Sequence, residues 1–204
     1  RPERFLQLSA EYNMIVANLT TAANIFHLLR RQVSWEFRKP CVVMSPKSLL
    51  RSEAAASPIK DFTSGTFMEV LDDPNAVAKD VKRVVLCSGK IFYELQDVQQ
   101  KKKIKDAAIV RLEQLHPFPE KQLGNVLKKY PGAKLVWAQE EPSNMGYWSY
   151  ILRHMPKAGL DVVARKASAS PATGYSKVHK AEQEKILNQA FEIDPHMSTA
   201  LKGL

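Results

Sequence analysis

The sequence predicts an α/β fold in which a mostly parallel sheet is flanked by helices. Two observations support this prediction. Short apolar runs, typical of buried strands, alternate with stretches in which apolar residues recur at helical spacing. The strand-like runs are also separated by stretches long enough to hold a helix, and a helical crossover between two strands makes those strands parallel.

The first 50 residues hold a leading helix and one strand–helix–strand unit. The elements expected there are a helix over residues 3–12, a strand over 13–17, a helix over 22–33 and a strand over 41–44. Thr20 and Thr21 stand just before the second helix, where a hydroxyl oxygen can accept a hydrogen bond from a free backbone N–H. The closing strand is apolar throughout, so we expect it to be fully buried.

Residues from 82 onward repeat the alternation of strands and helices. The elements expected there are strands over 83–87, 107–111, 135–138 and 160–164, and helices over 91–100, 119–130, 147–154 and 176–191. Pro119 suits the first turn of its helix, because the N–H that proline lacks has no partner there, and Pro131-Gly132 ends the same helix. This part of the chain therefore has the pattern of a parallel sheet with helices on its faces.

The composition changes between the two parts. Residues 46–80 are rich in Ser, Asp, Pro and Ala and show no sustained period, which is typical of an interdomain connector. The expected organisation is a first domain piece over residues 1–50, a connector over 51–80, a second domain over 81–193 and a flexible tail over 194–204.

The overall composition is that of a globular chain, with 45% hydrophobic and 25% charged residues. No apolar stretch approaches the roughly 18 residues that would cross a bilayer, and no signal peptide is visible, so we expect no membrane association. The chain opens at Arg1 without a methionine, which indicates a fragment or a processed chain.

The net charge of +9 comes from 30 Lys and Arg against 21 Asp and Glu. The densest basic cluster, Lys101–Lys105, stands between an expected helix and an expected strand, where cations suit the helix dipole. No aromatic residues interleave with it, as base stacking would require. Nucleic acid is therefore not an expected partner, and the charge favours an anionic ligand or an acidic protein surface.

Cys41 and Cys87 each lie inside an apolar run. They are expected to be buried, reduced thiols. Two single cysteines and scattered histidines lack the spacing of a ligand set, so we expect no metal site.

A polar run, Ala138–Trp148, follows the expected strand over 135–138 and is the most distinctive string in the chain. Strand ends of this kind carry the working loops of open α/β sheets. Glu140 and Glu141 could form a general acid/base pair, since adjacent like charges raise one pKa. Neighbours on an extended chain point to opposite sides, however, so a structural role is favoured. That role would be capping the helix near Met145–Trp148 or pairing with an Arg or Lys across an interface.

Ser88-Gly89-Lys90 ends one expected strand and begins a helix, a geometry that can hold a phosphate. The string falls far short of a complete phosphate-binding loop, so an ordinary β–α turn is favoured over a weak anion site. The histidines His27, His116 and His179 have no acid partner at a fixed spacing, and each is interpreted as structural or solvated. From residue chemistry alone, we expect no catalytic residue in this chain.

Several strings together resemble one known family. They are Glu3-Arg-Phe-Leu-Gln7, Phe26-His-Leu-Leu-Arg-Arg-Gln32, Arg38-Lys-Pro40, Val42-Val-Met-Ser-Pro-Lys-Ser-Leu-Leu-Arg51, Cys87-Ser-Gly-Lys90, Arg111-Leu-Glu-Gln-Leu115, Pro117-Phe-Pro119, Gln139-Glu-Glu-Pro142 and Ala167-Ser-Ala-Ser-Pro171. The chain resembles the C-terminal portion of the thiamine-diphosphate-dependent decarboxylating (first) component of the 2-oxoglutarate dehydrogenase complex. The resemblance runs from Arg1 to about Phe191.

The resemblance implies that residues 1–50 end a pyrimidine-binding domain and that residues 81–193 form a transketolase-type C-terminal domain. In this family thiamine diphosphate and Mg²⁺ are bound mostly by residues upstream of the matching part. The catalytic histidines and the glutamate beside the pyrimidine also lie upstream. The resemblance therefore implies no catalytic, cofactor-binding or metal residue in this chain.

The whole enzyme implied by the resemblance oxidatively decarboxylates 2-oxoglutarate on thiamine diphosphate and transfers the succinyl group to a lipoyl arm. Its implied partners are a second copy in a homodimer and the lipoyl-bearing succinyltransferase component. The implied location is the bacterial cytoplasm. The fragment alone is expected to be inactive and to serve dimer assembly and allosteric regulation.

Some relatives in the family bind acetyl-CoA as an activator near this domain. The resemblance places Gln114 and Lys121 near the matching positions, where a cation suits a CoA phosphate. The resemblance thus implies an acetyl-CoA or AMP effector site that includes these two residues.

Two alternatives remain open. The first is the paralogous enzyme that acts on 2-oxoadipate, because the residues that would separate the two substrates lie upstream. The second is a non-catalytic interaction module, an α/β domain that binds an anionic nucleotide or CoA.

Overall fold

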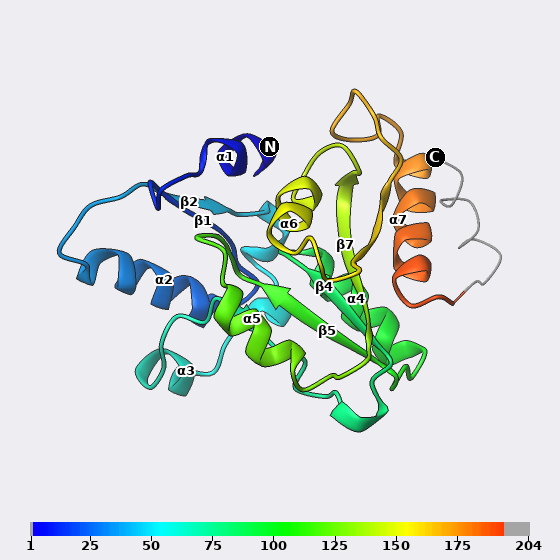
Figure 1. Cartoon of the computed structure of the whole chain (residues 1–204), viewed down its shortest axis with the longest axis horizontal. Helices are drawn as coiled ribbons and strands as arrows, with labels where there is room; N and C mark the ends of the chain where they lie inside the picture. Colours follow the sequence, from blue (N-terminus) through cyan, green and yellow to red (C-terminus); the bar gives the residue numbers. More distant parts are fainter. Residues whose placement is uncertain (1, 194–204) are drawn as a thin grey trace.

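The chain folds around two sheets that lie side by side, in a computed structural model that describes residues 2–193 (Figure 1). The first sheet has the strand order β2-β1-β6, and the second has the order β3-β5-β4-β7-β8. Four strand pairs are parallel, and only β1 with β6 and β3 with β5 are antiparallel within residues 2–193. The predicted α/β class with a mostly parallel, helix-flanked sheet is confirmed.

The first sheet is built from both parts of the chain. β1 (Ile15–Asn18) pairs in parallel with β2 (Cys41–Met44), as the strand–helix–strand pattern predicts. On its other side β1 pairs antiparallel with β6 (Gln114–His116), a short strand that the sequence did not predict. β2 lies at the edge of this sheet and all four of its residues are half-buried, so the prediction of a fully buried strand is wrong. Cys41 is accordingly half-buried rather than buried.

α2 (Ala22–Ser34) crosses over between β1 and β2. Its first turn is capped as predicted, because the Thr21 hydroxyl oxygen accepts from the backbone N–H of Asn24 at 3.4 Å. The inner face of the helix packs on the sheet through Leu28, which is fully buried.

The second sheet holds most of the core. Its strands, in spatial order, are β3 (Val70–Leu71), β5 (Ala107–Leu112), β4 (Arg83–Cys87), β7 (Lys134–Pro142) and β8 (Asp161–Arg165). Every residue of β4 and β5 is buried, because both strands have neighbours on two sides and helices on two faces.

Helices cover both faces of this sheet, and strand alternation sorts the core between them. On one face, Val84 and Leu86 of β4 join the apolar cluster that includes residues of α5 (Glu120–Leu127) and α6 (Trp148–His154). On the other face, Val85 and Cys87 pack in the cluster of α4 (Ile91–Lys101) and α7 (Ser176–Ala190).

The segment predicted as a connector contains short regular elements. They are three 3-10 turns, at Lys47–Leu49, Glu53–Ala55 and Ala78–Asp80, the single-turn helix α3 (Ile59–Thr63) and the edge strand β3. None of them is long enough to show a period in the sequence, which is why the pattern predicts none of them.

The end of the first helix and the end of β7 differ from the predicted boundaries. α1 (Pro2–Leu8) ends before residue 12, because Glu11 and Tyr12 adopt positive φ angles of 51° and 57°. β7 continues to Pro142, so part of the polar run is strand rather than loop. The predicted tail over 194–204 lies outside the described residues.

Candidate functional site

The carboxyl ends of β1, β4 and β7 meet at one edge of the molecule, and the polar run that distinguishes the sequence lies there. Residues from all three strand ends line a pocket of about 230 Å³. They include Asn18 from the end of β1, Ser88 and Lys90 after β4, Glu140 and Glu141 in β7, and Tyr147. Open α/β sheets bind ligands at such strand ends, so this edge is the candidate site.

Gln139 holds the turn that follows β7 in one conformation. Its side-chain oxygen accepts from the indole N–H of Trp137 at 3.0 Å and from the backbone N–H groups of Tyr147 and Trp148 at 3.1 and 3.0 Å. Its amide nitrogen donates to the carbonyls of Pro142 and Met145 at 3.1 and 2.9 Å. Because the side chain is 2% exposed, these bonds form out of water. Gln139, not one of the neighbouring acids, therefore caps the start of α6.

Gly146 closes this turn. It has a φ of +71°, which a residue with a Cβ rarely adopts, and a Cβ there would lie 2.8 Å from Cβ of Glu141. The glycine is thus required both by the backbone angle and by the close approach of β7.

Glu140 is neutralised by its neighbours. Its carboxylate pairs with Lys90 and accepts from the Gln183 amide of α7 at 3.3 Å. Lys90 also lies 3.7 Å from the Glu94 carboxylate. Glu140 thus pairs with a lysine, but the lysine belongs to the same chain and not to a partner across an interface. The pair joins β7 to the start of α4.

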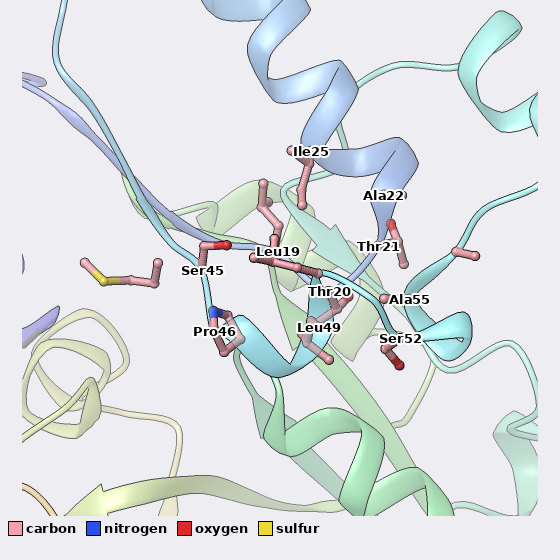
Figure 2. A pocket seen from close by; sticks show the side chains of 13 residues that line it. Leu19, Thr20, Thr21, Ala22, Ile25, Ser45, Pro46, Leu49, Ser52 and Ala55 are labelled. Carbon is pink, nitrogen blue, oxygen red and sulfur yellow. The ribbon is translucent and has the colours of Figure 1, made fainter.

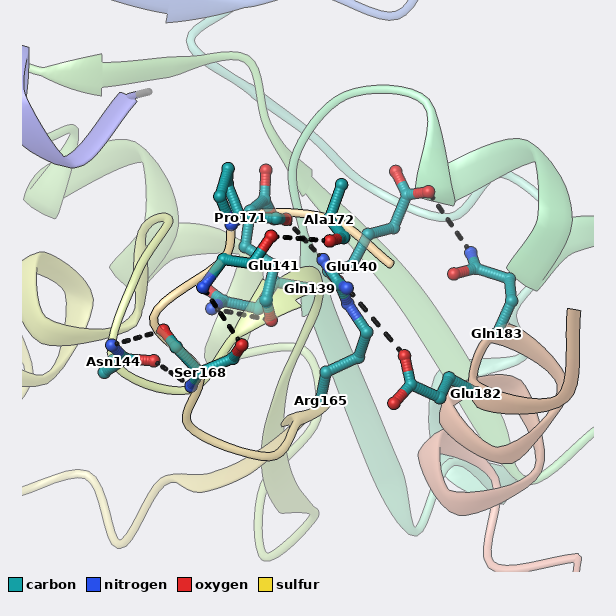
Figure 3. A network of polar contacts seen from close by, with 11 residues as sticks. Gln139, Glu140, Glu141, Asn144, Arg165, Ser168, Pro171, Ala172, Glu182 and Gln183 are labelled. Carbon is teal, nitrogen blue, oxygen red and sulfur yellow. Dashed lines mark hydrogen bonds and ion pairs between the residues drawn. The ribbon is translucent and has the colours of Figure 1, made fainter. Parts of the chain in front are cut away.

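Arg165, at the end of β8, ties the same edge to the loop before α7 (Figure 3). Its guanidinium donates to the Glu140 carbonyl at 2.6 Å and to the Pro171 carbonyl at 2.6 Å, and it lies 3.8 Å from the Glu182 carboxylate. A second link in the same loop joins the Asn144 amide to the backbone of Ser168 by two hydrogen bonds. Hydrogen bonds therefore join the end of β7, the turn after it and the loop before α7 into one polar network.

Glu141 is the carboxylate of the site that forms no ion pair within residues 2–193. Burial raises the pKa of its carboxyl group, and the charge of Glu140 raises it further. The sequence did not predict that both acids would line one pocket, since alternation along a strand would separate them. The Tyr147 hydroxyl nearby accepts from the Asn18 amide at 2.8 Å, and burial raises the tyrosine pKa well above its usual value.

The Ser88-Gly89-Lys90 turn does not offer a free cradle for an anion. Gly89 has a φ of +72°, and the Asn18 side chain occupies the space beside it. A Cβ at Gly89 would lie 2.2 Å from the Asn18 amide nitrogen. Ser88 donates its hydroxyl to the Leu112 carbonyl at 2.7 Å, and Lys90 is paired with acids. The turn is thus the ordinary β–α turn that the sequence analysis favoured.

A buried polar cluster centred on Glu113 lies behind this edge, and no pattern in the sequence predicts it. The Glu113 carboxylate is 0% exposed and accepts from the backbone N–H and the hydroxyl of Thr20 at 2.9 and 2.6 Å and from the Asn24 amide at 3.0 Å. Arg111 donates to the Thr20 hydroxyl oxygen at 2.9 Å and stacks on the ring of Phe92. The cluster joins the end of β1 to the end of β5.

The two predicted effector residues have different surroundings. Gln114 is buried, and its amide is bonded at both ends: the oxygen accepts from Arg31 at 2.5 Å and the nitrogen donates to the Pro117 carbonyl at 2.9 Å. Lys121 is exposed on the first turn of α5 and makes no ion pair within residues 2–193. Only Lys121 presents a free polar group at the surface.

The three histidines fit the structural or solvated interpretation. His27 is buried, with its Nε2 atom 2.6 Å from the Asp61 carbonyl oxygen. His116 is buried with Nδ1 at 2.9 Å from the Tyr150 hydroxyl, and its burial lowers the ring pKa. His179 is exposed on α7.

Of the two cysteines, Cys87 is fully buried and its burial raises the thiol pKa to about 12, as expected of an inert core thiol. In the part of the chain that the structure describes, no three His, Cys, Asp or Glu side chains gather closely enough to hold a metal ion. None of the helices described there has the length and apolar character to cross a membrane.

Two family models match the chain. The model described as 2-oxoglutarate dehydrogenase C-terminal matches residues 56–191, and the model described as transketolase, pyrimidine binding domain matches residues 1–53.

Curated relatives match almost the whole chain. The 2-oxoglutarate dehydrogenase E1 component of Cupriavidus necator is 48% identical over 198 residues, which cover 94% of this chain and 21% of the relative. The E1 component of Azotobacter vinelandii is 45% identical over 203 residues, or 95% of this chain and 22% of the relative. The E1/E2 component of Corynebacterium glutamicum is 45% identical over 200 residues, or 94% of this chain and 16% of the relative. The chain thus spans about a fifth of the length of the curated relatives that it matches.

Proposed function

This chain belongs to the family of 2-oxoglutarate dehydrogenase C-terminal domains, and we propose that it forms the C-terminal part of an enzyme that oxidatively decarboxylates 2-oxoglutarate. The observation that supports this most strongly is the order of the two family matches, residues 1–53 and then 56–191. These are the segments that contribute β1 and β6 to one shared sheet.

Thiamine diphosphate would supply the carbanion chemistry of such an enzyme. The described residues do not fit its diphosphate group, because Lys90 is paired with acids and Asn18 fills the space over Gly89. We therefore infer that residues outside this chain hold the cofactor and its Mg²⁺. The succinyl group would pass to the lipoyl arm of a succinyltransferase component.

We propose that this part of the enzyme serves dimer assembly. The outer face of α2 supports this role, because Phe26, Leu29 and Val33 repeat at helical spacing and are 42%, 52% and 76% exposed. An apolar stripe of this kind on a solvent-exposed surface is typical of a protein interface. A second copy of the enzyme is the partner that we propose for it.

The substrate can be tested with the complete gene product that carries this chain. We expect thiamine-diphosphate-dependent reduction of ferricyanide with 2-oxoglutarate, and a lower kcat/KM with 2-oxoadipate. A higher kcat/KM with 2-oxoadipate would assign the chain to the paralogous enzyme. No turnover of either substrate, with the cofactor bound, would leave only a non-catalytic role and would refute the proposal.

We further propose an acetyl-CoA or AMP effector site that includes Lys121. The exposed, unpaired ammonium group of Lys121 supports contact with a phosphate. Gln114 would not contact the effector; its hydrogen bonds would hold the Arg31 side chain and the Pro117 carbonyl in place. Calorimetric titration of the complete enzyme tests this. Lys121→Ala should weaken acetyl-CoA binding several-fold, whereas Lys128→Ala, which changes another exposed lysine just past α5, should not. No heat with millimolar acetyl-CoA or AMP would exclude the site.

A further inference from the structure

A second pocket, of about 300 Å³, lies at the carboxyl ends of β1 and β2 (Figure 2). It is bounded by the first turn of α2 and by the two 3-10 turns at Lys47–Leu49 and Glu53–Ala55. Figure 2 shows Ile25 of α2 on one side of the space and Pro46 and Leu49 on the opposite side. The stretch Met44–Pro46 separates this pocket from the smaller one beside Glu141.

The walls of this pocket are mostly apolar and carry no ionisable side chain. The apolar part comes from Leu19, Ala22, Ile25, Met44, Leu49 and Ala55. Hydroxyl groups interrupt it at Thr21, Ser45 and Ser52. A charged ligand would lose its hydration in such a pocket without gaining a counter-ion, which costs much free energy. The free energy of desolvation is far smaller for an uncharged ligand. The lining therefore selects an apolar body with a small number of uncharged hydrogen-bonding groups.

Two of the hydroxyl groups that line the pocket are available for hydrogen bonds to a ligand. The Thr20 hydroxyl is already engaged, since it donates to Glu113 and accepts from Arg111. Ser45 and Ser52, in contrast, form no side-chain hydrogen bond with another residue within the range 2–193, so each can donate to or accept from a ligand.

One wall of the pocket is fastened to its neighbour by a hydrogen bond. The backbone N–H of Ala23 donates to the Ser57 hydroxyl at 3.1 Å, which joins the connector to the first turn of α2. Within the connector, the backbone N–H of Ala55 donates to the Ser52 carbonyl at 3.1 Å and closes a 3-10 turn that lines the pocket. Ligand pockets are usually formed before the ligand binds, and these bonds order this wall without a ligand.

The volume limits the size of the ligand. About 300 Å³ corresponds to roughly ten water molecules at ~30 Å³ each and stands at the lower end of the range for ligand pockets. A single ring or a short acyl chain fits, and a nucleotide does not. The ligand therefore differs from the proposed effector at Lys121.

We propose that this pocket binds a small uncharged molecule with an apolar body and one or two hydroxyl or carbonyl groups. The ligand would touch residues 19–52, which lie in one family match, and Ala56, which begins the other. It would thus bridge the two matched segments.

Fluorine NMR of 4-fluorobenzyl alcohol with the complete gene product tests this proposal. We expect line broadening that saturates at millimolar probe. The charged analogues 4-fluorobenzylammonium and 4-fluorobenzoate should bind about tenfold more weakly or worse. Absence of saturable binding by the alcohol, or equal binding by a charged analogue, would overturn the proposal.

A matched pair of alanine-to-leucine variants locates the site. Ala56→Leu places a larger side chain in the pocket from its exposed side and should weaken binding of the alcohol about tenfold. Ala54→Leu makes the same change at an exposed neighbour outside the lining and should leave binding unchanged. If Ala56→Leu melts at a lower temperature, Leu50→Phe, at another exposed lining residue, replaces it. Unchanged binding in the folded pocket variant would place the ligand elsewhere and refute the proposal.

Discussion

Gly146 is the most constrained single residue of the Gln139–Trp148 turn. Gly146→Ala would force a Cβ to 2.8 Å from Glu141 and 3.0 Å from the Gln139 amide, at a φ of +71°. We expect this variant to lose about 2–4 kcal/mol of unfolding free energy, measured by urea denaturation. Gly132→Ala is the control, because Gly132 has a φ of +77° but nothing within 4 Å, and it should lose only about 1 kcal/mol. Equal losses would mean that the close approach to β7 costs nothing.

Glu113 gives the stability of the protein a specific pH dependence. Burial raises the pKa of its carboxyl group above 4.5, against the hydrogen bonds from Thr20 and Asn24 that lower it. The folded protein therefore holds this proton more tightly than the unfolded chain. The stability that this proton contributes is fully present below the unfolded pKa and is lost as the pH rises through the folded pKa.

Comparison with Glu113→Gln isolates this contribution, because glutamine does not titrate. The unfolding free energy of the wild type minus that of the variant should decrease over the pH range that begins at the ordinary glutamate pKa of about 4.3 and extends upward. Urea denaturation at a series of pH values measures it. A difference that stays constant or grows over this range would contradict the raised pKa.

The contrast between Glu140 and Glu113 shows what single residues reveal in a sequence. Glu140 and Glu141 are conspicuous because they adjoin each other at a strand end. Glu113 is isolated in the sequence, and its partner Thr20 lies 93 positions away, so only the fold brings them together. Spacing cannot predict a contact that depends on the pairing of β1 with β6.

At the level of elements, α6 depends on a residue outside the helix. The Gln139 side chain accepts from the backbone N–H groups of Tyr147 and Trp148 and from the Trp137 indole. Gln139→Leu leaves these donors without a partner and should lower the unfolding free energy by about 2–4 kcal/mol in urea. Gln122→Leu, the same change at an exposed position of α5, should stay within about 0.5 kcal/mol. Similar small losses for both would show that the cap is dispensable.

Periodic elements could be predicted from the sequence, and short or polar ones could not. The helices and parallel strands of the second sheet follow from runs long enough to show their period. β3 and β6 have two and three residues, too few for any period. The sequence pattern ends the strand at residue 138 because Gln139, Glu140 and Glu141 are polar, whereas β7 continues to Pro142. Gln139 is buried there because its amide is hydrogen-bonded at both ends.

On the scale of the whole molecule, polar and backbone contacts fasten the two family-matched segments together. β6 pairs with β1, the Tyr93 hydroxyl bonds to the Thr20 carbonyl, and Glu113 accepts from Thr20. The domain boundaries at residues 50 and 81 stay a prediction, but these contacts indicate that both parts unfold together.

Native-state hydrogen exchange followed by mass spectrometry tests this coupling. Amides of β1 and of β4 should open with the same free energy, within about 0.5 kcal/mol. In Thr20→Val, which loses the hydroxyl at the centre of the cluster, β1 should open at lower free energy than β4. A lower opening energy for β1 in the wild type would show two independent units.

We propose that this chain supports decarboxylation from outside the catalytic centre of the complete enzyme. The direct measurement is the rate of 2-oxoglutarate decarboxylation by the complete gene product that carries Glu140→Gln and Glu141→Gln together. We predict a rate within about threefold of the wild type and a lower melting temperature, because the Lys90 pair is lost. A loss of about a hundredfold or more, with dimer and melting temperature intact, is the size expected for removal of a general acid or base and would contradict the account.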